Sequence, residues 1–311
     1  MPIHLPQQAL AGPRACRVLA WALAVGWGAW GTCLAGPSGP VASRDGLLAG
    51  YAAISKRPDA RLAGRPLYLQ SDEADGVLRG EVYAVLDQPF EAVRQALSLP
   101  APWCEVLILH LNVKSCQPSG EPGGSVQLEV GLGRKFEEPL ERAHALRLGF
   151  QLAVSRPDRL QVLLQAPQGP LGSHDFRIEL DAMPLAADRA LLRLTYSYGM
   201  SRVARWAMQA YLATLGRDKR GFSVVGRDPQ GQPLRIDGLR GVLERNAVRY
   251  YLAVDVYMGT REVPSERRLE QRLQGWFAAT EAYEQLHEVE RDAYLSMKRK
   301  ETQRLGVRPG L

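Results

Sequence analysis

The feature that most constrains the fold is a series of segments in which apolar and polar residues alternate with a period of two. The clearest ones are residues 126–132, 146–155, 175–181 and 192–198. Successive side chains of a strand point to opposite faces of a sheet, so each segment predicts a strand with one apolar and one polar face. Short connections such as SRPDR and AADR separate them. The pattern predicts an antiparallel sheet with one solvated face and one apolar face that needs a cover.

A helix is predicted directly after the last of these strands, over residues 201–216, SRVARWAMQAYLATLG. At helical spacing, one of its faces consists of Val203, Trp206, Ala207, Ala210, Tyr211 and Thr214. Met208, Leu212 and Leu215 extend the apolar surface most of the way round, which is typical of a buried helix. Ser201 is suited to cap the first turn and Gly216 to end the helix. We therefore expect this helix to cover the apolar face of the sheet.

Other elements come before the alternating segments. Residues 66–87 predict a hairpin with an acidic, Gly-containing turn, SDEADG. Two short helices follow, interrupted by Pro100 and Pro102. Residues 109–116 alternate again and predict a strand with His110, Asn112, Lys114 and Cys116 on one face.

The order strand, two short helices, antiparallel strands and long apolar helix resembles the helix-grip fold of the START-like, or SRPBCC, superfamily. The resemblance covers about residues 77–225 and depends on element order and on segments such as GEVYAVLDQPFEAVRQAL, residues 80–97. It implies an α+β fold in which a curved antiparallel sheet wraps around a long helix. It also implies a hydrophobic cavity between sheet and helix, which is common in the superfamily.

The chain continues where the resemblance ends. Beyond Gly216 the sequence predicts a hairpin about DPQGQ, a helix that ends at Gly259, and a last helix from Ser265 whose charged second half projects into solvent. The predicted organisation is a signal peptide (1–35), a poorly structured lead-in (36–65), a START-like helix-grip domain (66–225), and a hairpin with a C-terminal helical extension (226–311).

The N-terminus has the pattern of a secretory signal peptide. Arg14 and Arg17 precede the apolar segment VLAWALAVGWGAW, which is short for a membrane span, and small residues follow up to Ala35. Cleavage after Ala35 leaves 37 basic and 33 acidic residues, a net charge of about +4. A lipidated Cys33 and an uncleaved membrane anchor are the alternatives. The pattern predicts export, to the periplasm if the source is a Gram-negative bacterium.

Cys104 and Cys116 are the two cysteines that remain after cleavage. In an oxidising compartment, a pair joining the end of a helix to the next strand favours a disulfide over a catalytic or metal-binding pair. A loop this short contributes about 3 kcal/mol in the chain-entropy model.

His110, Asn112 and Lys114 form the first set of candidate ligand-binding residues. If their strand face lines the cavity, they can bind a polar head group, and His110 is the candidate general base of an enzyme. If the face is solvated, the alternation has no functional meaning.

The second set consists of four aromatic residues at the end of the last strand and on the predicted covering helix: Tyr196, Tyr198, Trp206 and Tyr211. Aromatic side chains with a polar group suit a pocket for an apolar ligand, although each is equally at home in a core.

Two basic patches are weaker candidates. Arg245 and Arg249 are four residues apart on a helix and can meet an anionic lipid head or an acidic loop, although a solvated helix face is the simpler interpretation. Arg217, Lys219 and Arg220 form a similar patch just beyond the predicted covering helix.

No motif of a hydrolase, metalloprotease, nucleotide-binding or redox protein is present, and the histidines lack metal-ligand spacing, so we expect no cofactor and no metal. No basic segment is interleaved with aromatics, which argues against nucleic-acid binding. The first hypothesis is an exported protein that binds a hydrophobic or amphipathic small molecule, such as a lipid, and that is not an enzyme. The alternatives are an enzyme that uses His110, and an envelope interaction protein with a filled core.

Overall fold

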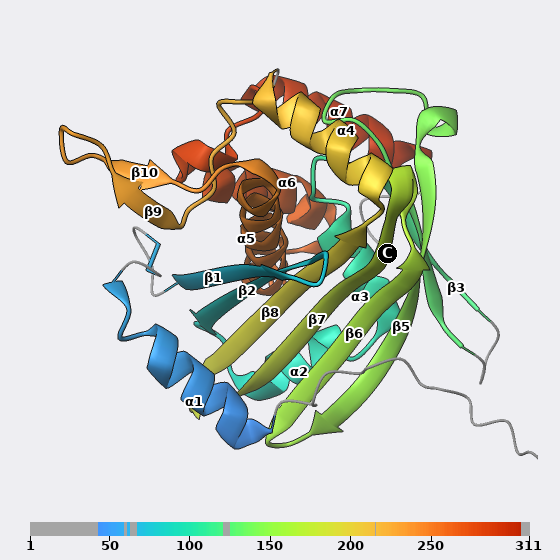
Figure 1. The fold of residues 1–311 in the computed structure, drawn as a ribbon. Coiled ribbons are helices and arrows are strands. Elements are labelled where there is room, and N and C mark those ends of the chain that lie inside the picture. The colour runs from blue at the N-terminus through green and yellow to red at the C-terminus, as the bar shows by residue number, and fades with distance from the viewer. Residues whose placement is uncertain (1–42, 59–60, 63–66, 121–124, 215, 306–311) are drawn as a thin grey trace, which may run out of the picture. The chain divides into compact units, whose positions relative to one another are not determined.

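Eight antiparallel strands form one sheet in the computed structural model, which describes residues 43–58, 61–62, 67–120, 125–214 and 216–305 (Figure 1). Along the sheet the order is β1-β2-β8-β7-β6-β5-β4-β3. The strands are β1 (Leu67–Ala74), β2 (Val77–Leu86), β3 (Val113–Ser119), β4 (Gln127–Leu132), β5 (His144–Arg156), β6 (Arg159–Gln168), β7 (Ser173–Ala186) and β8 (Arg189–Met200). The predicted signal peptide lies outside the described residues.

The local sequence explains the strands and their connections. Leu180 and Leu194 point to the core, whereas the residues next to them, Glu179 and Thr195, point to the other face, as the alternation predicts. The predicted hairpin is β1–β2, and its two turn residues, Asp75 and Gly76, have φ angles of 51° and 78°. These positive φ angles define the tight turn that an Asp-Gly pair favours between antiparallel strands.

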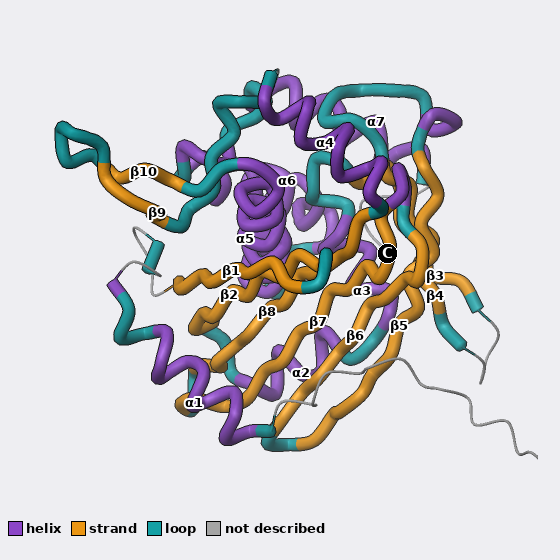
Figure 2. The backbone as a smooth tube through the Cα atoms, in the orientation of Figure 1, coloured by secondary structure: helices purple, strands orange, loops and turns teal. Residues whose placement is uncertain are grey.

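One side of the sheet is covered by helices, as Figure 2 shows. The two predicted short helices are α2 (Phe90–Leu97) and α3 (Pro100–Leu107). Beside them lies α5 (Gly238–Gly259), which packs against β1, β2, β8 and α3. The predicted α+β helix-grip fold is therefore confirmed.

The identity of the covering helix was predicted wrongly. The helix at Ser201, α4 (Arg202–Ala213), does form, and Ser201 caps it by accepting a hydrogen bond from the Ala204 N–H at 3.2 Å. However, Val203 is 81% exposed and Trp206 is 77% exposed. The helix that covers the sheet is α5, which belongs to the segment that the sequence assigned to the C-terminal extension. Its apolar residues lie all round the helix rather than along one stripe, as in a helix buried on every side.

The chain after α5 forms two helices instead of the single one predicted. These are α6 (Ser265–Glu281) and α7 (Arg291–Arg304), separated by the short 3₁₀ helix η4 (Glu284–Leu286). The prediction that the tail projects into solvent is wrong, because Tyr294, Leu295 and Met297 of α7 are buried. The predicted hairpin about DPQGQ is present as β9 (Val224–Arg227) and β10 (Pro233–Arg235).

The opposite face of the sheet is polar, and α1 (Arg44–Ile54) covers part of it with Leu47 and Ile54. Over the rest, charged side chains pair across strands. Arg193 contacts Asp181 at 2.6 Å, and Arg159 contacts the same carboxylate at 2.8 Å. Asp181 is fully buried by these partners. This face is thus polar as predicted, but part of it forms an ion-pair network instead of an open solvated surface.

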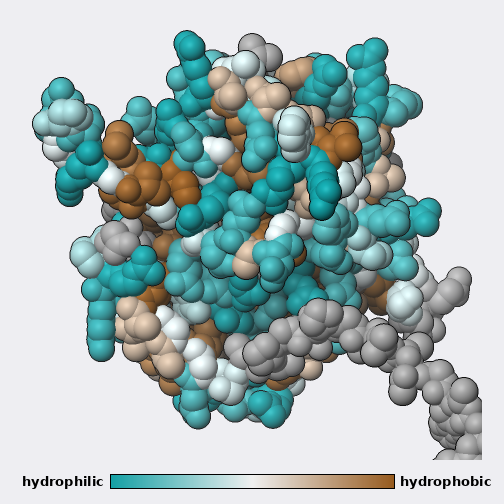
Figure 3. Space-filling model, in the orientation of Figure 1, coloured by the Kyte–Doolittle hydropathy of each residue, from teal (hydrophilic) through white to brown (hydrophobic). Residues whose placement is uncertain are grey.

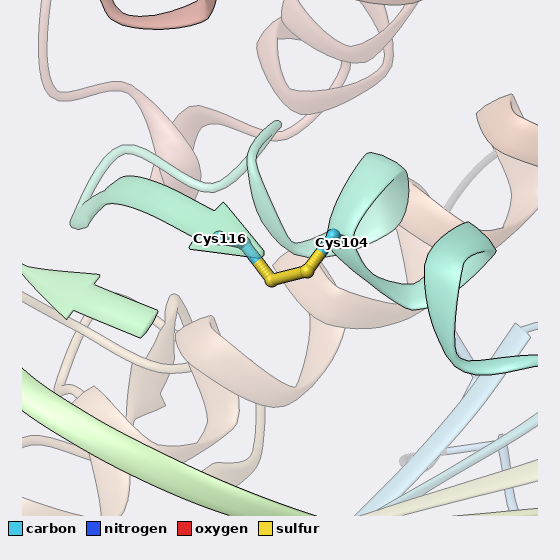
Figure 4. The surroundings of a disulfide bond; sticks show 2 residues. All are labelled: Cys104 and Cys116. Carbon is cyan, nitrogen blue, oxygen red and sulfur yellow. A yellow bond between two sulfur atoms is a disulfide. The ribbon is translucent and has the colours of Figure 1, made fainter. Parts of the chain in front are cut away.

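The predicted disulfide between Cys104 and Cys116 is present, with the two Cα atoms 5.1 Å apart (Figure 4). Cys104 lies on α3 and Cys116 on β3, an edge strand. The bond therefore fastens the edge of the sheet to the helix layer.

Candidate functional site

His110 does not lie on a strand as predicted. Strand β3 begins at Val113. His110 and Asn112 therefore belong to the turn between α3 and β3. The His110 side chain is buried and stacks on Tyr250 of α5, with 4.7 Å between ring centroids. Trp276 of α6 lies on another side at 6.4 Å. His110 is therefore a core residue under α5.

Tyr196 and Tyr198, the two aromatic candidates on β8, lie close to His110. Tyr196 packs against Tyr250 at 5.2 Å and against Tyr198 at 5.4 Å between centroids. Burial raises the pKa of Tyr198 to about 12 and the pKa of Tyr196 well above its ordinary value. His110 and Tyr196 thus meet through Tyr250, and Tyr198 joins this row of stacked and tilted rings through Tyr196.

His110 is poorly placed to act as a general base. Burial lowers its pKa well below the ordinary value, and the positive charges of Arg249 and Lys298 lower it further. Its Nδ1 atom accepts from the Asn112 N–H at 3.2 Å, and the nearby Asn246 side chain, which acts to raise the pKa, does not outweigh burial. The ring is neutral at pH 7, and solvent does not reach it.

Asn112 and Lys114 bond to other parts of the chain. The Asn112 side-chain amide donates to the Gly133 carbonyl at 2.7 Å. Lys114 pairs with Glu301 of α7 at 3.0 Å and donates to the carbonyls of Leu111 and Phe136. Both side chains hold neighbouring segments together.

Trp206 and Tyr211, the remaining predicted ligand-binding residues, lie apart from this group. Both are on α4, where Trp206 is 77% and Tyr211 is 42% exposed. The structure therefore brings the rings of three of the seven predicted binding residues together, whereas the side chains of Asn112 and Lys114 bond to other segments and Trp206 and Tyr211 lie apart on α4.

A pocket of about 170 Å³ lies elsewhere, between the loop after β4 and the start of α7. Most of its lining is apolar or aromatic, and Lys135 and Glu137 provide the charge. The lining residues are Lys135, Phe136, Glu137, Val289, Ala293, Tyr294, Ser296 and Met297. The pocket is smaller than a typical drug-sized site and has one basic group at its wall.

Lys135 connects this pocket to a group of partly and fully buried charges, which we call the Glu288 cluster. Four cationic side chains surround the single carboxylate of Glu288, two of them from the buried helix α5. Lys219 contacts this carboxylate at 2.8 Å and Arg249 at 3.2 Å, while Lys135 and Arg245 also pair with it. The cluster consists of Glu288, Lys135, Lys219, Arg245 and Arg249.

The position of Glu288 follows from the break in the last predicted helix. The chain leaves α6, forms η4 and then crosses α5 before α7 begins, which places Glu288 over Arg245 and Arg249. Arg249 also donates to the Leu286 carbonyl at 2.9 Å. The prediction that Arg245 and Arg249 form a solvated face is wrong, because both are buried and the acidic loop that they meet is the one at Glu288.

The charges in this cluster do not balance. Burial favours the neutral form of Glu288, yet Lys135, Arg249 and Arg245 hold its pKa well below its usual range. Burial, with Arg249 adding to it, lowers the pKa of Lys135 to about 7, although Glu288 acts in the opposite direction. Burial and Arg245 lower the pKa of Arg249 to about 10. One carboxylate is thus insufficient for the four cations, and the Nε atoms of both arginines are buried without a partner in the described chain.

Sequence reasoning missed Lys135 and Glu288. They lie 153 positions apart, and neither belongs to a motif. The available signal was the Arg245–Arg249 pair inside an apolar helix, because a buried cation requires a counter-charge.

Other kinds of site are not evident in the described part of the chain. It contains no group of three or more His, Cys, Asp or Glu residues placed to hold a metal ion. None of its helices is both long enough and apolar enough to cross a membrane.

Comparison with known proteins gives similarity in fold. No protein-family model and no curated protein matches the chain. Among solved structures, norcoclaurine synthase from Thalictrum flavum is 14% identical, with 47% of this chain and 89% of that one covered and a TM-score of 0.33. A START superfamily protein from Mycobacterium smegmatis is 15% identical, with coverages of 45% and 92% and a TM-score of 0.29. The Zhui aromatase/cyclase from Streptomyces sp. R1128 is 13% identical, with coverages of 65% and 92% and a TM-score of 0.31.

The protein has a helix-grip fold, the fold that the sequence predicts. The basis is the chain's own strand order, with α2 and α3 after β2 and a long helix on the covered side of the sheet. The resemblance predicted from the sequence is confirmed at this level. Similarity of this degree carries no information about substrate or ligand.

Proposed function

We propose that this START-like protein binds a small amphipathic anion, with its charged group at Lys135 and its apolar part in the adjoining pocket. The observation that carries the proposal is that Lys135 lines a mostly apolar pocket and also belongs to the Glu288 cluster, in which four cations share one carboxylate. The pocket volume suits a short acyl or aromatic group rather than a whole long-chain lipid.

The protein has partly removed the positive charges of the Glu288 cluster from water. Two guanidinium groups and Lys135 share one carboxylate, so a second anion at Lys135 meets attraction that the protein itself does not satisfy. Lys135 is the cation that an anion in the pocket can reach, because its side chain is 30% exposed and it lines the pocket. Tyr294 and Met297 at the apolar wall remove the rest of the ligand from water, which supplies affinity at about 25 cal/mol per Å².

Calorimetric titration with benzoate and hexanoate tests the proposal, with benzamide and hexanol as neutral ligands of similar shape. We expect the carboxylates to bind at least about tenfold more tightly than the neutral compounds, since a charge-assisted hydrogen bond contributes about 1.5–3 kcal/mol. Lys135→Met, which keeps the length of the side chain, should remove this preference. Lys56→Gln is the matched control, because it removes an exposed lysine near α1. Equal binding of benzoate and benzamide, or unchanged binding in Lys135→Met, would overturn the proposal.

An enzymatic function has no comparable support. His110, its leading candidate base, is not among the residues that line the pocket. It is also held neutral inside the core.

We propose in addition that the protein is exported. The disulfide between Cys104 and Cys116 supports export, because such bonds persist mainly in oxidising compartments. The signal-peptide pattern of residues 1–35 supports it independently. Mass spectrometry of the protein from fractionated cells tests this, since export with cleavage after Ala35 predicts a mature chain that begins at Gly36. A full-length chain with free thiols in the cytoplasmic fraction would contradict it.

A further inference from the structure

The exposed face of α4 carries apolar residues where a surface helix normally carries polar ones. Val203 is 81% exposed, Trp206 is 77% exposed and Tyr211 is 42% exposed. Ala207 and Ala210, which share this face at helical spacing, are exposed as well. Pale and brown residues gather over α4 in the upper part of Figure 3. Single exposed apolar side chains are normal on a protein surface, but here several of them share one face of one helix.

The position of α4 is fixed by its other face. Leu212 is buried in the core, and Met208 packs against it. Arg205 pairs with Glu73 and donates to the Gly76 carbonyl at 3.2 Å, which ties the helix to the β1–β2 turn. The apolar stripe is therefore presented outward by a docked helix.

Leu171 extends the same surface. It lies in the 3₁₀ turn η3 (Pro170–Gly172), which contacts α4, and the Ser201 N–H donates to the Gly172 carbonyl at 2.9 Å. Leu171 has φ 56° and ψ 32°, in the left-handed region that is unfavourable for leucine, and its side chain is 72% exposed. Burial does not compensate this backbone strain, and strain of this kind gathers at functional sites.

The charge next to the stripe is positive. Residues 201–216 contain Arg202 and Arg205 and no acidic residue. Arg202 is exposed and makes no ion pair with another described residue, and Arg217 follows just beyond the helix, largely exposed. An amphipathic helix with Trp and Tyr on one side and arginine at its margin matches a helix that lies in the interface of an anionic bilayer.

A second copy of the chain fits this surface less well. A helix of 12 residues is about 18 Å long and about 10 Å wide, so its face covers on the order of 200 Å², against about 800 Å² per partner in a stable complex. A membrane has no such size requirement, since the rest of the protein can remain in water.

We propose that α4 and Leu171 form a docking face that inserts Val203, Trp206, Tyr211 and Leu171 into the headgroup boundary of a membrane containing anionic lipids. Arg202 contacts the lipid phosphates. Docking holds the protein at the membrane surface without a transmembrane segment.

Co-sedimentation of the full chain with vesicles of phosphatidylcholine, with or without phosphatidylglycerol, tests this proposal. We expect binding only when phosphatidylglycerol is present, because the stripe alone is narrow, and a decrease in binding when salt is added. Trp206→Ser and Leu171→Ser should each reduce vesicle binding about tenfold or more, because each removes an apolar side chain from the interface. Val225→Ser is the matched control. Val225 is 63% exposed on β9, and its replacement should change binding less than about twofold.

Two further measurements separate the alternatives. The difference between the emission spectra of the wild type and Trp206→Phe should shift to shorter wavelength when vesicles are added, as Trp206 leaves water. Binding that is equal in Trp206→Ser and the wild type would overturn the proposal and assign vesicle contact to another segment, such as the apolar N-terminus. The proposal also fails if the protein binds neither vesicle. A dimer in sedimentation velocity that Trp206→Ser dissociates would assign the face to a second copy.

Discussion

Replacing Glu288 by glutamine removes the single carboxylate of the Glu288 cluster with little change in shape. The side chains of Glu288, Arg245 and Arg249 are 6%, 4% and 2% exposed, so the two guanidinium groups cannot recover their hydration in the folded state. Breaking a buried pair by removing one partner costs about 3–5 kcal/mol. For a chain of this size we expect the unfolding midpoint to fall by on the order of 10 °C.

The loss should depend on pH, because Lys135 titrates within the cluster. In the wild type the pKa of Lys135 is about 7, below its value in the unfolded chain, and Glu288 is one of the groups that raise it. Without Glu288 the pKa of Lys135 falls further. At a pH between the Lys135 pKa of the folded variant and that of the folded wild type, the folded variant binds fewer protons than the folded wild type. The unfolding free energy of the variant therefore rises more steeply with pH in this interval. The difference in unfolding free energy should therefore be larger at pH 6 than at pH 8.

Urea unfolding at these two pH values, followed by circular dichroism, measures the effect. Glu290→Gln is the matched control, because Glu290 lies two residues away with its side chain 89% exposed, and its replacement should cost less than about 0.5 kcal/mol. Sulfate should restore part of the stability of Glu288→Gln, because an anion replaces the missing carboxylate. A loss below about 1 kcal/mol for Glu288→Gln, equal at both pH values, would refute the buried, unbalanced cluster.

Reduction of the disulfide, or replacement of Cys104 and Cys116 by serine, should lower the unfolding free energy by about 2–4 kcal/mol, measured by urea unfolding with and without reductant. Benzoate affinity should be constant between about pH 5 and pH 6, where benzoate is ionised and Lys135 is protonated, and should fall above pH 7, since the bound anion favours the protonated form of Lys135. Calorimetry that shows affinity rising from pH 6 to pH 8 would contradict the assignment. Leu243→Ala on α5 should cost about 2–5 kcal/mol, whereas Trp206→Ser on α4 should cost less than about 0.5 kcal/mol, and thermal unfolding of the two variants compares them.

The sheet could be predicted because its information is local. Alternation of apolar and polar residues determines which face of β7 or β8 is buried, and the Asp75–Gly76 turn determines how β1 returns to β2. The disulfide was predictable for the same reason, since Cys104 and Cys116 lie only 12 positions apart. These features depend on neighbours in the sequence, and the structure confirms them.

The candidate site depends on contacts between distant segments, which no local pattern encodes. Lys135 comes from a loop after β4, Arg249 from α5, and Glu288 from the break before α7. Strand alternation wrongly extended β3 back to His110, because a turn after a helix can also alternate by chance. The site residues predicted from that strand face consequently separated into one core ring, His110, and two side chains that bond to other segments, Asn112 and Lys114.

The sheet is covered by α5 rather than by α4 for a physical reason, and this reason connects the fold to both proposals. A one-sided apolar stripe predicts burial only if no better cover for the sheet exists elsewhere in the chain. Helix α5 is a better cover, because its 22 residues include apolar side chains on nearly every side, and Leu243, Ala247 and Val248 are fully buried.

Helix α5 also carries two arginines into the interior, and these require Glu288 from a later segment. Once α5 occupies the sheet, no other described segment covers the stripe of α4, although α4 itself remains anchored by Leu212. The same packing event therefore creates a buried excess of positive charge at one place and an exposed apolar face at another.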